Sequence, residues 1–180
     1  MFPFILLSLI LPILAQKCAT PLNRGHSKCA EPQKSVKYYF DEQLETCLPY
    51  LYEGCDGSDN RFDEAEFCMQ RCRPADKGIC GGGSKALGSC STRNKKCPKG
   101  AKCINMAFGL GLCCDEKIQE AWIRENKPEC KSTEELVTET VWYGEQALLG
   151  RSCEHKFCPN GSKCVDGRWL AHCCRPIKVR

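Results

Sequence analysis

The chain lacks the features that mark an enzyme or a nucleic-acid-binding protein. None of its three histidines, His26, His155 and His172, pairs with a nucleophile in a known motif or stands at the spacing of a zinc finger. It has no phosphate-binding glycine loop, since the run 81–83 is better explained as a linker. A net charge of +4 is too small to indicate nucleic acid. We therefore expect no catalytic residue, cofactor, metal or nucleic-acid partner, and predict that the protein is not an enzyme.

Long apolar runs are also scarce. The longest covers residues 4–14, which is too short to span a bilayer but suits the core of a signal peptide. Ala15 fits the position before a cleavage site, so we predict a signal peptide at residues 1–16. A buried strand or a membrane anchor is the alternative, but Cys18 follows at once and a basic cluster does not. We expect a secreted, extracellular protein without a membrane span.

Cysteine, in contrast, is abundant, with 18 residues among 180. This density is typical of secreted proteins that rely on disulfides because their hydrophobic core is small. The chain divides into three segments with six cysteines each, and this even number allows nine bridges with no cysteine left over. We predict a small disulfide-rich α+β protein made of three modules.

The first module carries the pattern of a β-hairpin. Val36, Tyr38 and Phe40 alternate with Lys37 and Tyr39. This period of two predicts a strand that buries the first set and exposes the second. A polar turn and a second aromatic strand follow, which completes a twisted hairpin.

A helix is predicted at residues 62–72. Asp63 is placed to cap its N-terminus, and Glu66, three residues later, can complete a capping box. Phe62 and Phe67 have the spacing of a hydrophobic staple. The two cysteines near its end are four residues apart, so they lie one turn above the other and can tie the helix to two different segments.

The spacing of the first six cysteines resembles that of the Kunitz (pancreatic trypsin inhibitor type) domain. The last three intervals, of 7, 12 and 3 residues, match that family, as do Tyr50, Gly54 and Asn60. The resemblance implies a twisted β-hairpin plus a C-terminal helix at residues 17–74. Among the 15 possible pairings of six cysteines, it also implies three bridges: Cys18–Cys72, Cys29–Cys55 and Cys47–Cys68.

The same resemblance implies a function. Kunitz inhibitors present a rigid, substrate-like loop around the second cysteine to a serine protease, and its ordering entropy is already spent in folding. Ala30 would enter the primary specificity pocket, and its small side chain points to a small-pocket, elastase-like protease. The implied loop residues are Lys28, Cys29, Ala30 and Glu31, with Glu53 and Gly54 beside the bridge.

Three departures from the family pattern favour a second hypothesis. The intervals on either side of Cys29, of 10 and 17 residues, are each two residues longer than in the family. The glycine expected two residues before Cys29 is displaced to Gly25, and Glu53 replaces a glycine before Cys55. The alternative is a non-inhibitory extracellular structural or matrix-binding protein that uses the Kunitz fold as a binding module.

The remaining cysteines form an internal duplication, with repeat 1 at residues 75–117 and repeat 2 at residues 130–180. Both contain Cys-Pro-x-Gly-x-Lys-Cys and end in two neighbouring cysteines, which point to opposite sides of an extended chain and should bond different partners. The repeats resemble the lustrin-like cysteine-rich repeats of secreted nematode proteins and, loosely, the whey-acidic-protein core. Their internal pairing stays open.

Between the repeats, we predict a helical linker at residues 118–129, with Asp115 as its cap. This helix would pack on repeat 1 or bind a partner. The insertion at residues 131–146 predicts a strand or a helix, and the pattern does not decide between them.

Two surface features complete the analysis. A basic cluster in repeat 1 could meet sulfated glycans or other extracellular matrix, although a solvated loop face is the simpler explanation. Asn160 begins a glycosylation sequon. The residues of the basic cluster are Arg93, Lys95, Lys96, Lys99 and Lys102.

Overall fold

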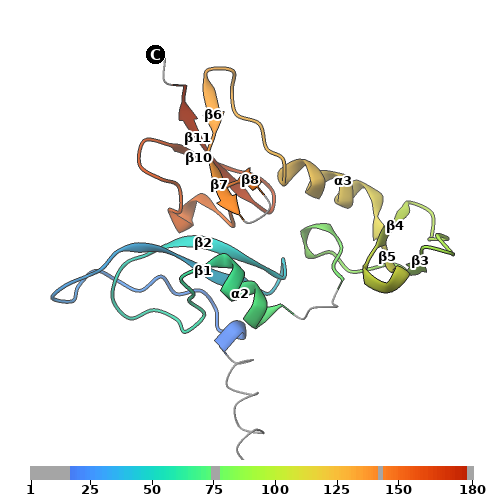
Figure 1. Ribbon diagram of the computed structural model, residues 1–180, viewed down its shortest axis with the longest axis horizontal. Helices are drawn as coiled ribbons and strands as arrows, with labels where there is room; N and C mark the ends of the chain where they lie inside the picture. The colour runs from blue at the N-terminus through green and yellow to red at the C-terminus, as the bar shows by residue number, and fades with distance from the viewer. Residues whose placement is uncertain (1–16, 74–77, 142–143, 178–180) are drawn as a thin grey trace, which may run out of the picture. The chain divides into compact units, whose positions relative to one another are not determined.

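The computed structural model describes residues 17–73, 78–141 and 144–177. The chain divides into two compact units, Met1–Ala75 and Asp76–Arg180, which are described separately (Figure 1). The first unit contains the segment that resembles a Kunitz domain, and the second contains both repeats. The predicted signal peptide lies outside the described residues, and the predicted segment boundaries stay predictions.

The first unit is a β-hairpin with a helix on one face. Strands β1 (Ser35–Asp41) and β2 (Thr46–Tyr52) pair antiparallel, and α2 (Ala65–Cys72) follows them. Phe40 pairs with Cys47 in the register, so both side chains lie on the same face of the hairpin. The core packs that face against the helix, and its buried members are Cys18, Phe40, Cys47, Phe62 and Cys68.

The predicted alternation along β1 is wrong at two positions. Tyr39, expected to be exposed, is only 5% exposed, and Val36, expected to be buried, is 44% exposed. Tyr39 packs edge-to-face on Tyr50 of β2, with ring centroids 5.9 Å apart. Both faces of the hairpin are therefore buried near the turn, and a simple period of two cannot describe such a strand.

The predicted capping box is also wrong. The helix begins at Ala65 with Glu64 as its N-cap, and no side chain caps it. Asp63 instead pairs with Lys37 of β1, and this hydrogen bond lowers the pKa of the Asp63 carboxyl. The predicted aromatic contact is confirmed, since the rings of Phe62 and Phe67 lie 6.3 Å apart.

Three disulfides hold this unit together. They join Cys18 to Cys72, Cys29 to Cys55, and Cys47 to Cys68, the same pairs that the family resemblance implies. Removing one native bridge from a small secreted domain costs about 2–5 kcal/mol. Because the net stability of a whole domain is only about 5–15 kcal/mol, the bridges are a main source of stability here.

In the second unit, the repeats are small antiparallel sheets with the same plan. In each, the strand that contains the two neighbouring cysteines lies between the others. Repeat 1 consists of η1 (Gly81–Gly83), β3 (Gly88–Ser91), β4 (Ala101–Asn105), η2 (Ala107–Gly109) and β5 (Leu110–Asp115). Repeat 2 consists of β6 (Glu134–Leu136), β9 (Leu149–Gly150), η3 (Cys153–His155), β10 (Lys163–Asp166) and β11 (Ala171–Pro176).

The described part of the insertion in repeat 2 forms strands rather than a helix, and residues 142 and 143 lie outside the described residues. Part of it forms β6, which pairs with β11. The rest includes β7 (Thr138–Val141), which pairs with β8 (Gly144–Ala147) as a hairpin. Val137, which lies between β6 and β7, is buried in the core of repeat 2 with Phe157, Ala171 and Cys173.

The two repeats share one disulfide topology. In each, the first cysteine pairs with the sixth, the second with the fourth and the third with the fifth. Neighbouring cysteines therefore bond different partners, which confirms that prediction, and every cysteine of the chain is bridged within its own segment. The bridges are Cys80–Cys114, Cys90–Cys103 and Cys97–Cys113 in repeat 1, and Cys130–Cys174, Cys153–Cys164 and Cys158–Cys173 in repeat 2.

Helix α3 (Glu116–Glu125) joins the repeats. Asp115 caps it by accepting a hydrogen bond from the Ile118 amide at 2.9 Å, as predicted. The helix packs on η1, where the Gln119 side chain accepts a bond from the Gly81 amide at 2.8 Å. It also contacts repeat 2, so it is shared by both repeats. Within the described residues, no helix has the length and apolarity needed to cross a membrane.

Candidate inhibitory loop

The candidate loop is an exposed segment that precedes β1. Residues 26–34 are all exposed and contain only one isolated β-bridge, at His26. They include Lys28, Cys29, Ala30 and Glu31, the residues that the family resemblance implies. A serine protease could therefore reach the backbone around Ala30 without any rearrangement of the core.

The loop is fixed to the segment that follows β2. The Cys29–Cys55 disulfide holds the two Cα atoms 6.2 Å apart. His26 and Cys55 exchange two backbone hydrogen bonds of 2.9 and 3.0 Å, and the Glu53 amide donates to the Arg24 carbonyl at 2.9 Å. The structure thus brings Glu53 and the bridge against the loop.

Two glycines make this close approach possible. Gly54 has φ 107°, and a Cβ there would lie 2.6 Å from the Gln33 amide nitrogen. Gly25 has φ 71°, and a Cβ there would collide with the Cys55 carbonyl oxygen. Any larger residue at either position would push the two segments apart and strain the backbone. The displaced Gly25 is thus part of the loop support.

Glu53 has a role that its sequence position did not reveal. Its carboxylate pairs with the Arg24 guanidinium at 2.6 Å and with the Lys34 ammonium at 2.9 Å. Arg24 precedes the loop and Lys34 ends it, so one side chain holds both arms. The Glu53 side chain is only 18% exposed, and the Arg24 Nε also donates to the Leu51 carbonyl at 2.9 Å. Glu53, a departure from the family pattern, thus links the two arms of the loop.

His26 orders the residues just before Cys29. Its Nδ1 accepts a hydrogen bond from the Lys28 amide at 3.1 Å, so in the neutral ring the proton lies on Nε2. Nε2 lies 2.8 Å from the Asp56 carboxylate. Sequence reasoning missed the contact between His26 and Asp56. It also missed the roles of Arg24 and Lys34, because in each case the interacting residues lie far apart in the chain and belong to no motif.

In the same unit, a buried amide anchors the N-terminal segment to β1. Asn60, 1% exposed, accepts a hydrogen bond from the Phe40 amide at 2.8 Å. Its side-chain nitrogen donates to the carbonyls of Cys18, Thr20 and Phe40 at 2.9–3.0 Å. Tyr50 is fully buried in the same unit, and burial raises the pKa of its hydroxyl to about 12.

The repeats contain two groups of residues at metal-ligand distance within the described part of the chain. In each group, the candidate ligand atoms lie within 4.8 Å of one another. All five cysteines involved are in disulfides, so they offer no thiolate to a metal. The groups are Cys90, Cys97 and Cys113, and Cys130, His172 and Cys174.

Asn160 lies in an exposed turn of repeat 2. The Ser162 hydroxyl, the third residue of the sequon, donates to the Pro159 carbonyl at 2.6 Å within that turn. The side chain is accessible, and glycosylation at Asn160 stays a prediction.

Comparison with known proteins decides the family. The model of the Kunitz/Bovine pancreatic trypsin inhibitor domain matches residues 17–73. A Caenorhabditis elegans protein described as a BPTI/Kunitz inhibitor domain-containing protein is 40% identical over 176 residues, which cover 97% of this chain and 98% of that protein. The chain belongs to the Kunitz family. This family consists of protease inhibitors rather than enzymes.

Two further relatives match different shares of this chain. The major allergen Ani s 1 of Anisakis simplex is 35% identical over 170 residues, or 88% of this chain and 87% of the allergen. Similarity to the nematode proteins therefore extends beyond the Kunitz domain into the cysteine-rich repeats. The colostrum trypsin inhibitor of Bos taurus is 32% identical over 57 residues, or 32% of this chain and 79% of the inhibitor.

Proposed function

We propose that this Kunitz protein is a secreted inhibitor of serine endopeptidases that acts through the loop around Ala30. The supporting observation is the way the exposed loop is held. The Cys29–Cys55 bridge fixes its centre, and the Glu53 carboxylate pairs with cations on both of its arms. A loop ordered before binding loses little entropy in the complex, which favours tight binding over a small area.

Ala30 directs the proposal toward small-pocket, elastase-like proteases. Compared with a long apolar residue, alanine forgoes about 1.5–3 kcal/mol of burial in a deep pocket, which corresponds to roughly ten- to a hundredfold in affinity. In a shallow pocket, alanine in place of a long residue costs little affinity, because a long side chain could not be buried there. Lys28, Glu31 and Gly54 would lie along the same contact.

The test is titration of the oxidised mature chain, residues 17–180, against trypsin, chymotrypsin and elastase. We expect stoichiometric inhibition of elastase and weaker inhibition of the other two. Absence of inhibition at micromolar protein for all three would refute the proposal.

A substitution then tests the contact residue. Ala30→Lys should move the preference toward trypsin, because lysine suits a deep, acidic pocket. Ala19→Lys, at an exposed alanine beside Cys18, adds the same charge away from the loop and should leave the profile unchanged. If both variants behave like the parent protein, Ala30 is not the contact residue.

A second function is favoured by the loop length. Each interval around Cys29 is two residues longer than the family pattern, which changes the backbone that the mechanism needs. The second candidate is an extracellular structural protein that binds matrix or glycans and no protease. It predicts no inhibition together with retention on a sulfated-glycan column.

Secretion is proposed for both candidates. Nine disulfides require an oxidising compartment, and residues 1–16 carry the pattern of a cleaved signal. Amino-terminal sequencing of protein exported from eukaryotic cells should begin at Gln16 or Lys17. Export with Met1 still present would contradict this cleavage.

A further inference from the structure

The tip of repeat 1 exposes an aromatic residue in an unfavourable backbone conformation. Phe108 lies in η2 between β4 and β5, is 89% exposed and has φ 57°. Leu110 beside it is 59% exposed. A bulky residue rarely adopts the left-handed region, and such strain persists most often at functional positions.

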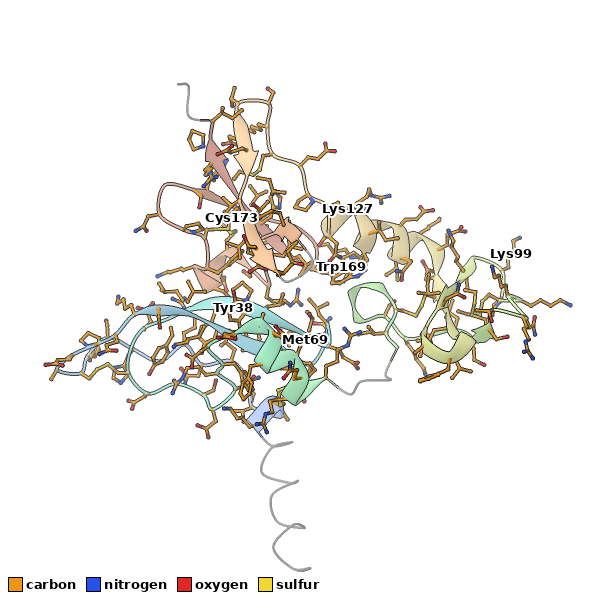
Figure 2. The ribbon with its side chains drawn as sticks, viewed as in Figure 1. Tyr38, Met69, Lys99, Lys127, Trp169 and Cys173 are labelled. Atoms are coloured by element: carbon orange, nitrogen blue, oxygen red, sulfur yellow. A yellow bond between two sulfur atoms is a disulfide. The ribbon has the colours of Figure 1, made fainter. Side chains whose placement is uncertain are left out.

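The corresponding tip of repeat 2 is covered by other residues. Trp169, five residues after Cys164, corresponds to Phe108, five residues after Cys103. Trp169, labelled in Figure 2, is only 8% exposed. Its ring packs edge-to-face on that of Trp122 in α3, with centroids 6.1 Å apart.

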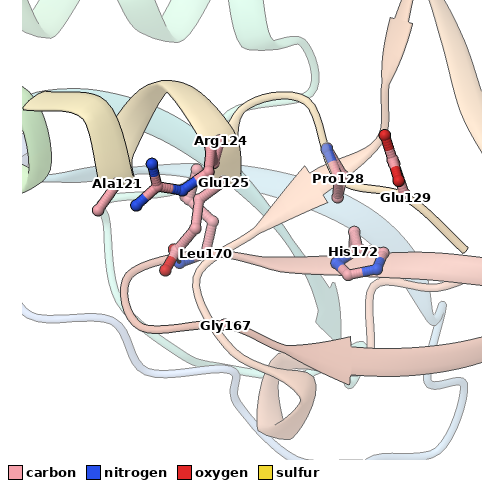
Figure 3. Close-up of a pocket in the computed structure, with 8 residues that line it drawn as sticks. All are labelled: Ala121, Arg124, Glu125, Pro128, Glu129, Gly167, Leu170 and His172. Carbon is pink, nitrogen blue, oxygen red and sulfur yellow. Dashed lines mark hydrogen bonds between the residues drawn. The ribbon is translucent and has the colours of Figure 1, made fainter.

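A carboxylate completes the cover on repeat 2. Glu125, at the end of α3, accepts hydrogen bonds of 2.7–2.9 Å from the amides of Arg168, Trp169 and Leu170. Glu125 and Leu170 line a pocket of about 330 Å³ beside this contact (Figure 3). No described residue covers Phe108 in the same way, so the exposed tip is particular to repeat 1.

The exposed tip belongs to a strongly cationic segment. Residues 78–114 contain six basic residues and no acidic one, whereas residues 130–174 contain five basic and six acidic residues. All six side chains are exposed, and within the described part of the chain none has an ion pair. They are Lys85, Arg93, Lys95, Lys96, Lys99 and Lys102.

Three of these cations lie in the loop next to the tip. The Thr92 amide donates to the Gly109 carbonyl at 2.9 Å, which joins the loop at residues 91–96 to η2. Arg93, Lys95 and Lys96 follow within that loop. An apolar tip and a cationic loop therefore share one end of the repeat 1 sheet.

We propose that this end of repeat 1 docks on anionic phospholipid surfaces. Phe108 and Leu110 would enter the boundary between headgroups and acyl chains, while Arg93, Lys95 and Lys96 pair with the negative headgroups. The strength of peripheral membrane binding increases with the apolar area inserted and with the positive charge that faces anionic lipids. A sulfated glycan would engage the cations and leave Phe108 in water.

Vesicle co-sedimentation of the oxidised mature chain tests the proposal. Vesicles of phosphatidylcholine alone are compared with vesicles that also contain phosphatidylserine, at low and high salt. We expect binding to the mixed vesicles that weakens with salt, and little binding to phosphatidylcholine. Absence of binding to the mixed vesicles overturns the proposal, and strong heparin retention in that case would assign the cations to a sulfated glycan.

Two variants separate the apolar and cationic contributions. Phe108→Asn, which tolerates the left-handed backbone, should weaken vesicle binding about tenfold or more while heparin retention stays unchanged. Arg93→Glu with Lys95→Glu should weaken both by more than about tenfold. The controls are Ile123→Ser, an exposed apolar residue of α3, and Lys131→Glu with Lys163→Glu in repeat 2. Equal vesicle binding by Phe108→Asn and the parent protein overturns the role of the tip.

Discussion

Glu53 stands where the family pattern has a glycine, and its carboxylate bonds cations on both sides of the candidate inhibitory loop. The arms of this loop are longer than in the family, so they need additional restraint. Arg24 and Lys34 would repel each other without the carboxylate between them. Glu53 therefore provides the restraint that the longer arms need. Neither departure from the family pattern suggests this role on its own.

Glu53→Gln tests this interpretation. The change keeps the shape and removes the charge, so Arg24 and Lys34 lose their common partner. We expect a loss of about 1–2 kcal/mol in stability, weaker inhibition of elastase, and faster cleavage of the loop by the protease. Inhibition assays and mass spectrometry of the complex measure these effects. The control is Glu66→Gln, at an exposed glutamate of α2, which changes the net charge by the same amount. It should leave stability, inhibition and loop cleavage unchanged.

Tyr50 provides a residue-scale prediction for alkaline pH. Among the described residues its buried hydroxyl has no hydrogen-bond partner, and burial raises its pKa to about 12 from the usual 10. Between these values the unfolded chain loses a proton that the folded chain keeps, so stability falls as the pH rises through this window. Below pH 10 this contribution is fully present.

Tyr50→Phe should remove that part of the alkaline destabilisation, and at neutral pH it should leave stability unchanged or somewhat higher, because the removed hydroxyl is buried without a partner among the described residues. Denaturant unfolding at neutral pH and near pH 11, midway in the window, measures the difference. Tyr52→Phe in the same strand serves as the control, because the Tyr52 hydroxyl is bonded to the Asp56 carbonyl. An unchanged pH dependence in Tyr50→Phe would contradict the prediction.

At the scale of elements, α3 shows what sequence patterns can and cannot predict. Its cap and apolar spacing are local, so Asp115 and the helix were predictable. Its contacts with repeat 2 depend on Trp169 and on the backbone amides of a distant loop, which no local pattern encodes. His172 of β11 lines the pocket beside this contact, where burial lowers its pKa although the Glu125 charge acts in the opposite direction.

Glu125→Ala tests the role of the helix as a cover for repeat 2. Three amides lose a charged acceptor at a partly buried site, so we expect a loss of about 1–3 kcal/mol and a lower melting temperature. Trp122 and Trp169 should become more exposed, which fluorescence quenching by iodide detects. Glu120→Ala, on an exposed position of the same helix, should change neither property.

At the scale of the whole molecule, prediction succeeded where covalent spacing decides and failed where packing decides. Cysteine intervals carried the resemblance that implies the Kunitz fold, and the position of the neighbouring cysteines favoured different partners for each, as the bridges confirm. The burial of Tyr39 could not be predicted, because it depends on Tyr50 and on two covered faces. The ion pairs of Glu53 with Arg24 and Lys34 could not be predicted either, because they form only when three separate segments of the chain meet in the fold.

The same distinction leads to a prediction about where the chain can be divided. The Kunitz unit contains its own three bridges and core, so residues 17–75 expressed alone should form the same disulfides and keep the inhibition profile of the full chain. A division between residues 129 and 130 should fail. It would separate α3, which contacts Gly81 on one side, from the Trp169 tip that it covers on the other.

Disulfide mapping and thermal unfolding of the fragments test this division. Residues 76–180 should oxidise to the six bridges of the repeats, while residues 130–180 alone should give mixed pairings or a melting temperature lowered by many degrees. Adding residues 76–129 in trans should restore some of the lost stability, because Glu125 and Trp122 then return. Native bridges and unchanged stability in residues 130–180 alone would show that repeat 2 does not need the helix.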